Sequence, residues 1–101
     1  MTRYGELSFE LRYHPDVKSE DIPLLNLKLK NRIRKAIETR LVEAPHLYGE
    51  PLRRTLRGYW KLRVGDYRVV YKIVGKEVWV LGIIHRKEVY KAIKKRIEKL
   101  I

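Results

Sequence analysis

Three cations near the middle of the chain have the types and the spacing that phosphate chemistry needs. Lys61, Arg63 and Arg68 flank the dipeptide Gly65-Asp66, which is typical of a turn between two strands. An arginine side chain matches phosphate oxygens with two parallel N–H groups, and a lysine surrounded by other cations loses its proton more readily than an isolated one. These residues suit RNA cleavage, in which the 2′-hydroxyl attacks the neighbouring phosphate.

The sequence lacks the residue patterns that other hydrolytic mechanisms require. The chain has no cysteine, and His14, His46 and His85 lie far apart along it. The carboxylates do not cluster as a magnesium site requires, and no glycine-rich phosphate loop is present. The sequence therefore predicts phosphoryl chemistry that uses neither a metal ion nor another cofactor.

Hydrophobic periodicity predicts an α+β fold. Four segments alternate apolar and polar residues, the period of half-buried strands: residues 7–13, 59–64, 67–74 and 77–84. Three segments have helical spacing: residues 16–22, 27–43 and 87–101. Asn26 is expected to cap the second of these helices. We expect residues 1–101 to form a single domain, with about four antiparallel strands, the N-terminal helices packed on one face and a C-terminal helix.

Two-residue turns that begin with glycine set the expected pairing of the last three strands. A turn at residues 65–66 places Arg63 opposite Arg68, and alternation along the strand projects Lys61 from the same face. Like charges placed directly opposite each other are unfavourable unless an anion lies between them. We therefore expect a phosphate-binding patch, the alternative being a polar face that only meets solvent.

The turn at residues 75–76 extends this patch. It places Ile83 opposite Arg68, so that His85 follows on the same face and Arg86 comes directly after it. A slip of one residue in the register would scatter the cluster, because it turns each side chain to the other face.

The charge balance points to an anionic partner. Lysine and arginine total 24 residues against 12 acids, a formal net charge of +12. Such an excess predicts contact with nucleic acid, with an acidic protein, or with both. The alternative is the surface of a thermophilic protein, but there the two signs are roughly balanced. No apolar run approaches the ~20 residues of a membrane span, and no signal peptide opens the chain, so we expect a cytoplasmic protein without membrane contact.

Two stretches of the sequence resemble the RelE/ParE toxin superfamily, and the likeness extends over about residues 9–97. The first is the run Arg63-Val64-Gly65-Asp66-Tyr67-Arg68-Val69-Val70-Tyr71. The second is Ile84-His85-Arg86, followed by Val89-Tyr90, and it resembles the RelE side of the superfamily. The resemblance implies the toxin of a type II toxin–antitoxin system, an endoribonuclease that cleaves mRNA in the ribosomal A site and halts translation.

The resemblance also implies partners and roles for individual residues. A small acidic antitoxin of the RelB kind would bind the toxin in a hetero-oligomer, and mRNA and the ribosome would be its targets. Arg68 would bind the phosphate, and Lys61 would act as the base or as an electrostatic stabiliser. Arg86 would stabilise or protonate the leaving group, and Tyr90 would stack on the substrate.

Two further residues complete the expected site, and one position departs from the family. Arg63 would make a second phosphate contact, and His85 would bind substrate or serve as an alternative acid. Some members carry a second lysine where this chain has Tyr59, which argues against a mechanism with two lysines. Three alternatives remain open: a ParE-like toxin that inhibits DNA gyrase, a non-catalytic RNA-binding module, and an inactivated toxin.

Overall fold

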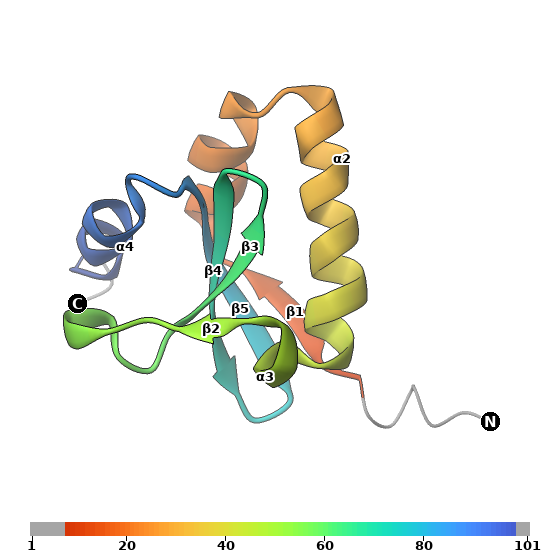
Figure 1. Cartoon of the computed structure of the whole chain (residues 1–101), viewed down its shortest axis with the longest axis vertical. Coiled ribbons are helices and arrows are strands. Elements are labelled where there is room, and N and C mark those ends of the chain that lie inside the picture. The colour runs from red at the N-terminus through yellow and green to blue at the C-terminus, as the bar shows by residue number, and fades with distance from the viewer. Residues whose placement is uncertain (1–7, 99–101) are drawn as a thin grey trace.

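The computed structural model describes residues 8–98, and they form a sheet with helices on both faces (Figure 1). The sheet has five strands in the order β1-β5-β4-β3-β2. Their bounds are β1 (Glu10–Tyr13), β2 (Glu50–Pro51), β3 (Trp60–Val64), β4 (Tyr67–Val74) and β5 (Glu77–His85). The expected α+β class is confirmed. The expected strand position 7 and helix positions 99–101 lie outside the described residues.

The sheet differs from the expected one at its two edges. The strand β2 is an addition of two residues, and it pairs with β3 through Pro51 and Trp60. At the other edge β1 runs parallel to β5, with Glu10 opposite Glu77. Parallel strands need a long connection rather than a hairpin, and here three strands and every described helix except α4 lie between β1 and β5.

The helices follow the predicted spacing. The N-terminal pair consists of η1 (Val17–Asp21) with η2 (Ile22–Leu24), and α2 (Leu27–Ala36) with its continuation η3 (Ile37–Leu41). Asn26 caps α2 as expected, because its side-chain oxygen accepts a hydrogen bond from the Leu29 amide at 2.8 Å. The remaining helices are α3 (Pro45–Tyr48), η4 (Arg54–Leu56) and α4 (Val89–Glu98).

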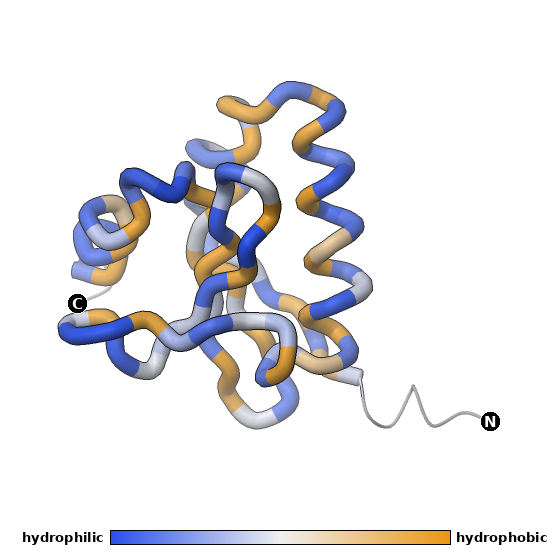
Figure 2. Tube along the Cα trace, viewed as in Figure 1, coloured by the Kyte–Doolittle hydropathy of each residue, from blue (hydrophilic) through white to orange (hydrophobic). Residues whose placement is uncertain are grey.

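The main core lies between α2 and the sheet. The hydrophobic segments of α2 turn toward the sheet and its hydrophilic ones turn away (Figure 2). The side chains that fill this core include Ile33, Ile37, Leu41, Leu62, Val64, Val69, Tyr71, Val78, Val80 and Ile83. Burying each such side chain contributes about 1.5–3 kcal/mol.

A second, smaller core lies on the opposite face of the sheet, under α4. It contains Leu52, Leu56, Val70, Ile84, Val89 and Ile93. The middle of β4 and β5 is thus buried on both sides, while Arg68 near the start of β4 is half-buried and Asp66 and Arg86, just outside the two strands, are exposed.

A β-bulge in β5 changes the register that the two turns predict. Tyr71 pairs with Val80 but Val70 pairs with Gly82, so Leu81 is an extra residue without a partner. The residue opposite Arg68 is therefore Ile84, and the expectation of Ile83 at that position is wrong. Every side chain that follows Leu81 projects from the face opposite to the one expected.

Candidate phosphate-binding site

The hairpin between β3 and β4 carries the strand cations as the sequence predicts. Arg63 lies directly opposite Arg68, and Lys61 lies opposite Val70. Gly65 opens the turn with φ of 61°, a backbone conformation that glycine adopts without steric cost. Because side chains alternate along a strand, Lys61, Arg63 and Arg68 project from the face that also carries the smaller core.

Arg68 is oriented by the backbone of the turn. Its Nη1 group donates to the carbonyl oxygens of Gly65 and Tyr67, each at 2.9 Å. None of the salt bridges among residues 8–98 involves Lys61, Arg63 or Arg68. The three positive charges are therefore not neutralised by any carboxylate in the described part of the chain, which suits the binding of an anion.

Arg86 comes to the same hairpin from the end of β5. Its amide donates to the Asp66 carbonyl oxygen at 2.8 Å, and its Nε lies 3.4 Å from Asp66 Oδ1. Both side chains are more than half exposed, so this ion pair is weak and an incoming anion can compete for the guanidinium. The bulge places Arg86 on the face of Ile84, which is also the face of Arg68.

His85 does not join this cluster, and the expectation that it lies on the face of Arg68 is wrong. It pairs with Tyr67, and the two rings meet edge to face with their centroids 5.5 Å apart. Tyr67 packs against the main core, so His85 projects from the α2 side of the sheet. The physical reason is the extra residue at Leu81, which reverses the alternation beyond it.

Tyr90 lies in the first turn of α4. Its hydroxyl oxygen accepts a hydrogen bond from the Arg53 amide at 3.1 Å, which ties α4 to the loop after β2. The side chain remains 42% exposed, so one part of the ring is available for stacking on a base.

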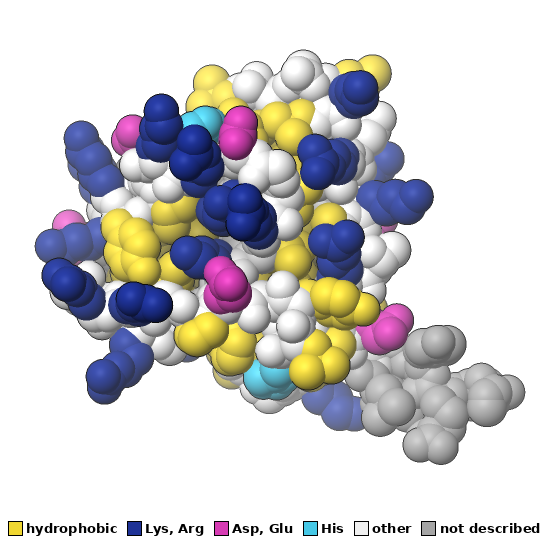
Figure 3. Space-filling view, in the orientation of Figure 1, with side chains coloured by type: hydrophobic (Ala, Val, Ile, Leu, Met, Phe, Trp, Pro, Cys, Tyr) yellow, Lys and Arg dark blue, Asp and Glu magenta, His cyan; other side chains and the backbone are white. Residues whose placement is uncertain are grey.

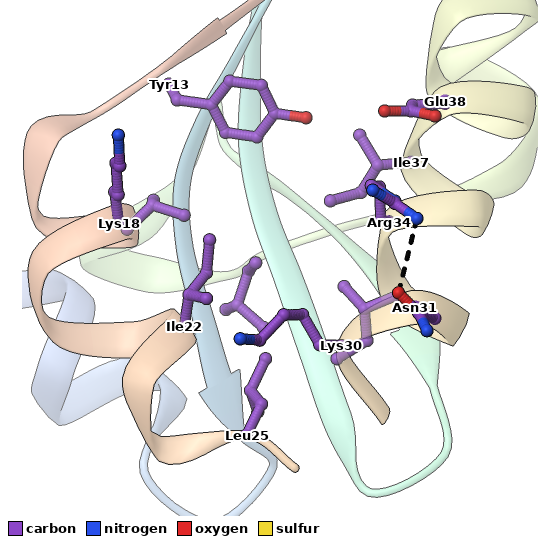
Figure 4. Close-up of a pocket in the computed structure, with 12 residues that line it drawn as sticks. Tyr13, Lys18, Ile22, Leu25, Lys30, Asn31, Arg34, Ile37 and Glu38 are labelled. Carbon is purple, nitrogen blue, oxygen red and sulfur yellow. Dashed lines mark hydrogen bonds between the residues drawn. The ribbon is translucent and has the colours of Figure 1, made fainter. Parts of the chain in front are cut away.

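A separate apolar groove of about 440 Å³ opens between η1–η2 and α2 (Figure 4). Its walls include Ile22, Leu25, Ile33 and Ile37, and the rim carries Lys18, Lys30 and Arg34 beside Glu38. Tyr13 points across the groove toward Glu38, and burial together with this carboxylate raises the pKa of the Tyr13 hydroxyl. Sequence reasoning missed the groove, because it depends on how two separate helices pack over β1 and β5.

The described residues contain no three histidine or acidic side chains placed to hold a metal ion. None of the helices within residues 8–98 is long and apolar enough to cross a membrane.

Comparison with known proteins identifies the family. The sequence model described as ParE toxin of type II toxin-antitoxin system, parDE, matches residues 11–90. The chain belongs to this toxin family. The RelE/ParE superfamily expected from the sequence is thereby confirmed, although the matching model is that of the ParE toxins. No curated protein sequence matches the toxin.

Solved structures of toxins from both sides of the superfamily share the fold. The toxin–antitoxin complex RelBE2 of Mycobacterium tuberculosis contains a chain with 27% identity and a TM-score of 0.72, covering 78% of this toxin and 99% of that chain. An E. coli RelE double mutant in the free state has 21% identity and a TM-score of 0.71, covering 89% of this toxin and 98% of that chain. A chain of the chromosomal ParDE system of P. aeruginosa has 16% identity and a TM-score of 0.60, covering 77% of this toxin and 96% of that chain.

Proposed function

We propose that this toxin is an endoribonuclease that cleaves mRNA in the ribosomal A site without a metal ion. The observation that carries the proposal is the pairing of Arg63 with Arg68, with Lys61 on the same face and no carboxylate neutralising them among the described residues. Like charges opposite each other in a ladder cost about 0.2–1 kcal/mol. A phosphate bound between the two arginines would turn this repulsion into attraction.

Each cation has a place in a transesterification. The 2′-oxygen attacks phosphorus as Lys61, in its neutral form, accepts the 2′-hydroxyl proton. Arg63 and Arg68 stabilise the negative charge that gathers on the non-bridging oxygens. The bond from phosphorus to the 5′-oxygen breaks, and Arg86 stabilises the negative charge on that oxygen until it takes a proton from water. The products are a 2′,3′-cyclic phosphate and a 5′-hydroxyl, and Tyr90 orients a base by stacking.

We propose that the ribosome is required because this face offers no histidine to serve as the base. His85 turns to the other side of the sheet, and lysines, unlike histidines, are in general mostly protonated near neutral pH and so less available to accept a proton. Catalysis then depends more on accurate placement of the 2′-hydroxyl, which the ribosome supplies by holding the mRNA.

Toeprinting of a defined mRNA on programmed ribosomes tests this proposal. Wild type should produce new A-site ends at an EDTA concentration low enough to keep the ribosomes intact. The variants Arg68→Ala and Lys61→Ala should no longer produce these ends. Arg12→Ala is the matched control, because Arg12 also lies on a strand but pairs with Glu10 and Glu77 at the far edge of the sheet. Intact mRNA with folded wild-type toxin would overturn the nuclease proposal.

Inhibition of DNA gyrase is the second candidate function, and the match to the ParE toxin model favours it. In that case the toxin would block supercoiling of relaxed plasmid by gyrase and leave mRNA intact. Arg68→Ala would then have no special effect on activity compared with Arg12→Ala. The two assays, run on the same preparations, separate the candidates.

We propose that the partner is a small acidic antitoxin, since the M. tuberculosis and P. aeruginosa relatives are toxin–antitoxin systems. The net charge of +12 favours an acidic partner, and the apolar groove beside α2 suits one amphipathic segment of it. Ile22→Lys, at the groove wall, should reduce co-purification with the co-expressed antitoxin. Unchanged co-purification would overturn the assignment of the groove.

A further inference from the structure

We propose that a hollow between α2 and β3 is a second binding site for the phosphate backbone of RNA. The proposal rests on the nuclease function above and extends it, because it assigns the path that the RNA takes away from the reacting phosphate. The hollow has a volume of about 220 Å³. Its lining consists of Arg32, Lys35, Ala36, Thr39, Arg40, Arg63 and Val64.

The cations of the hollow come from three elements that the fold brings together. Arg32 and Lys35 lie three residues apart on α2, so they share one face of the helix. Arg40 follows on η3, where its guanidinium lies 5.9 Å from the centre of the Tyr48 ring. Arg63 borders the same hollow at the edge of β3.

Contact between Arg32 and the β3–β4 turn joins the hollow to the candidate site. A Cβ placed on Gly65 would lie 3.1 Å from Arg32 Nη1, so the guanidinium lies against the bare backbone of the turn. The same turn orients Arg68 through the Gly65 carbonyl oxygen. Arg32 and Arg68 are therefore both neighbours of the same glycine.

Arg63 belongs to both sites, which makes the cationic surface continuous. It pairs with Arg68 across the hairpin, and it also lines the hollow. The short strand β2 pairs with β3 only at Trp60 and Lys61, so the outer edge of β3 is uncovered at Arg63. A phosphate backbone held by Arg68 can thus pass over Arg63 and reach α2.

The charges of the hollow are available to a ligand. Arg32, Lys35, Arg40 and Arg63 take part in none of the salt bridges formed within residues 8–98. Lys and Arg side chains extend from the β3–β4 hairpin across to α2 on this side of the molecule (Figure 3). An acidic peptide is the competing occupant, but Ala36 and Val64 are the two apolar residues among those that line the hollow.

Salt-dependent binding of a single-stranded RNA tests the proposal without relying on cleavage. The probe is a fluorescent oligonucleotide with 2′-O-methyl groups, which cannot undergo transesterification. Each phosphate contact to a single strand contributes about 0.7 to the slope of log K against log salt concentration. The double variant Arg32→Gln/Lys35→Gln of the full chain should therefore lower the slope by about 1.4 and weaken binding.

The matched control is Lys30→Gln/Arg34→Gln, which removes the same two residue types from the same helix on its groove side. It should leave most of the slope in place. Equal losses in the two double variants would overturn the proposal, because they would indicate an effect of net charge alone. Loss of antitoxin binding with unchanged RNA binding in the first variant would also overturn it, in favour of the acidic peptide.

A measurement of binding to programmed ribosomes distinguishes mRNA from ribosomal RNA as the ligand of the hollow. If the first variant loses affinity for the free oligonucleotide, the hollow binds mRNA. If it loses affinity only for programmed ribosomes, the hollow binds ribosomal RNA, and either result supports the phosphate site. A wild-type toxin that binds RNA through the hollow but cleaves no mRNA on ribosomes would overturn the nuclease proposal alone.

Discussion

Arg96 of α4 and Asp21 of η1 are 75 positions apart in the sequence, yet they form a buried ion pair with two hydrogen bonds. Arg96 Nη1 lies 2.8 Å from Asp21 Oδ2, and Arg96 Nη2 lies 3.0 Å from Asp21 Oδ1. Arg96 Nη1 also donates to the carbonyl oxygen of Leu81 at the bulge, and Asp21 accepts the amide of Ile83. The pair therefore holds α4, η1 and the irregular part of β5 together.

Removing one member of this pair should destabilise the toxin strongly. Asp21→Ala leaves the Arg96 charge buried without its main partner, so we expect a loss of about 3–5 kcal/mol in the free energy of unfolding, measured by urea denaturation. The control is Glu20→Ala, whose carboxylate is more than half exposed and 3.9 Å from Arg96. Similar small losses in both variants would show that the buried pair contributes little.

A methyl group added at Gly82 should loosen the contact of α4 with the sheet. A Cβ at this position would lie 2.7 Å from Ile93 Cδ1 and 3.2 Å from Arg96 Nη1, and both side chains are buried. Gly82→Ala should therefore cost about 1–3 kcal/mol and increase amide hydrogen exchange in α4 more than in α2. Gly75→Ala is the control, because a Cβ at this position meets no atom within 4 Å. Its loss of stability reports the replacement of a glycine without crowding, together with the strain of an alanine at φ of 60°.

The pairing of Arg63 with Arg68 predicts opposite effects on stability and on activity. Arg63→Gln removes a like-charge contact, so the free energy of unfolding should rise by up to about 1 kcal/mol. The rate of mRNA cleavage should fall by about 10²–10³, because one donor to the phosphate oxygens is lost. If cleavage and stability fall together, the residue is structural and the assigned role is wrong.

The buried hydroxyl of Tyr71 predicts a stability change at alkaline pH. It donates to the Pro45 carbonyl oxygen at 2.6 Å, and burial raises its pKa above the usual value of 10.0. A raised pKa in the folded state means that this contribution is complete below pH 10.0 and is lost as the pH rises further.

Comparison with Tyr71→Phe isolates that contribution. The variant leaves the Pro45 carbonyl without its donor, so it should be less stable than wild type by about 1–3 kcal/mol at pH 8. The difference should shrink at pH values above 10, since the other tyrosines are common to both proteins. A difference that stays constant over this range would contradict the assigned cause.

Much of the candidate site could be predicted because it depends on local structure. The turn at Gly65-Asp66 joins neighbouring strands, so strict alternation was enough to place Arg63 opposite Arg68. The helix after Asn26 was predictable for the same reason, since its cap and its apolar spacing lie within a few turns.

The features that sequence reasoning missed depend on distant contacts. Strand β1 pairs with β5 after the intervening chain has folded, and the hollow exists because α2 packs beside β3. Two local signals in the sequence nevertheless point to these features. Gly82 within a strand is typical of a bulge, and Arg96 lies three residues after Ile93, on the buried side of α4.

The extra residue at Leu81 decides which functional group shares the face of Arg68. With the bulge, Arg86 lies beside Asp66 at the hairpin of Arg68, and the imidazole of His85 packs against Tyr67. Deleting one residue at the bulge would exchange the faces of Arg86 and His85, because every later side chain of the strand would project from the opposite face. A toxin of this architecture can therefore change between arginine and histidine chemistry by altering chain length at one point of one strand, with no substitution in the site itself.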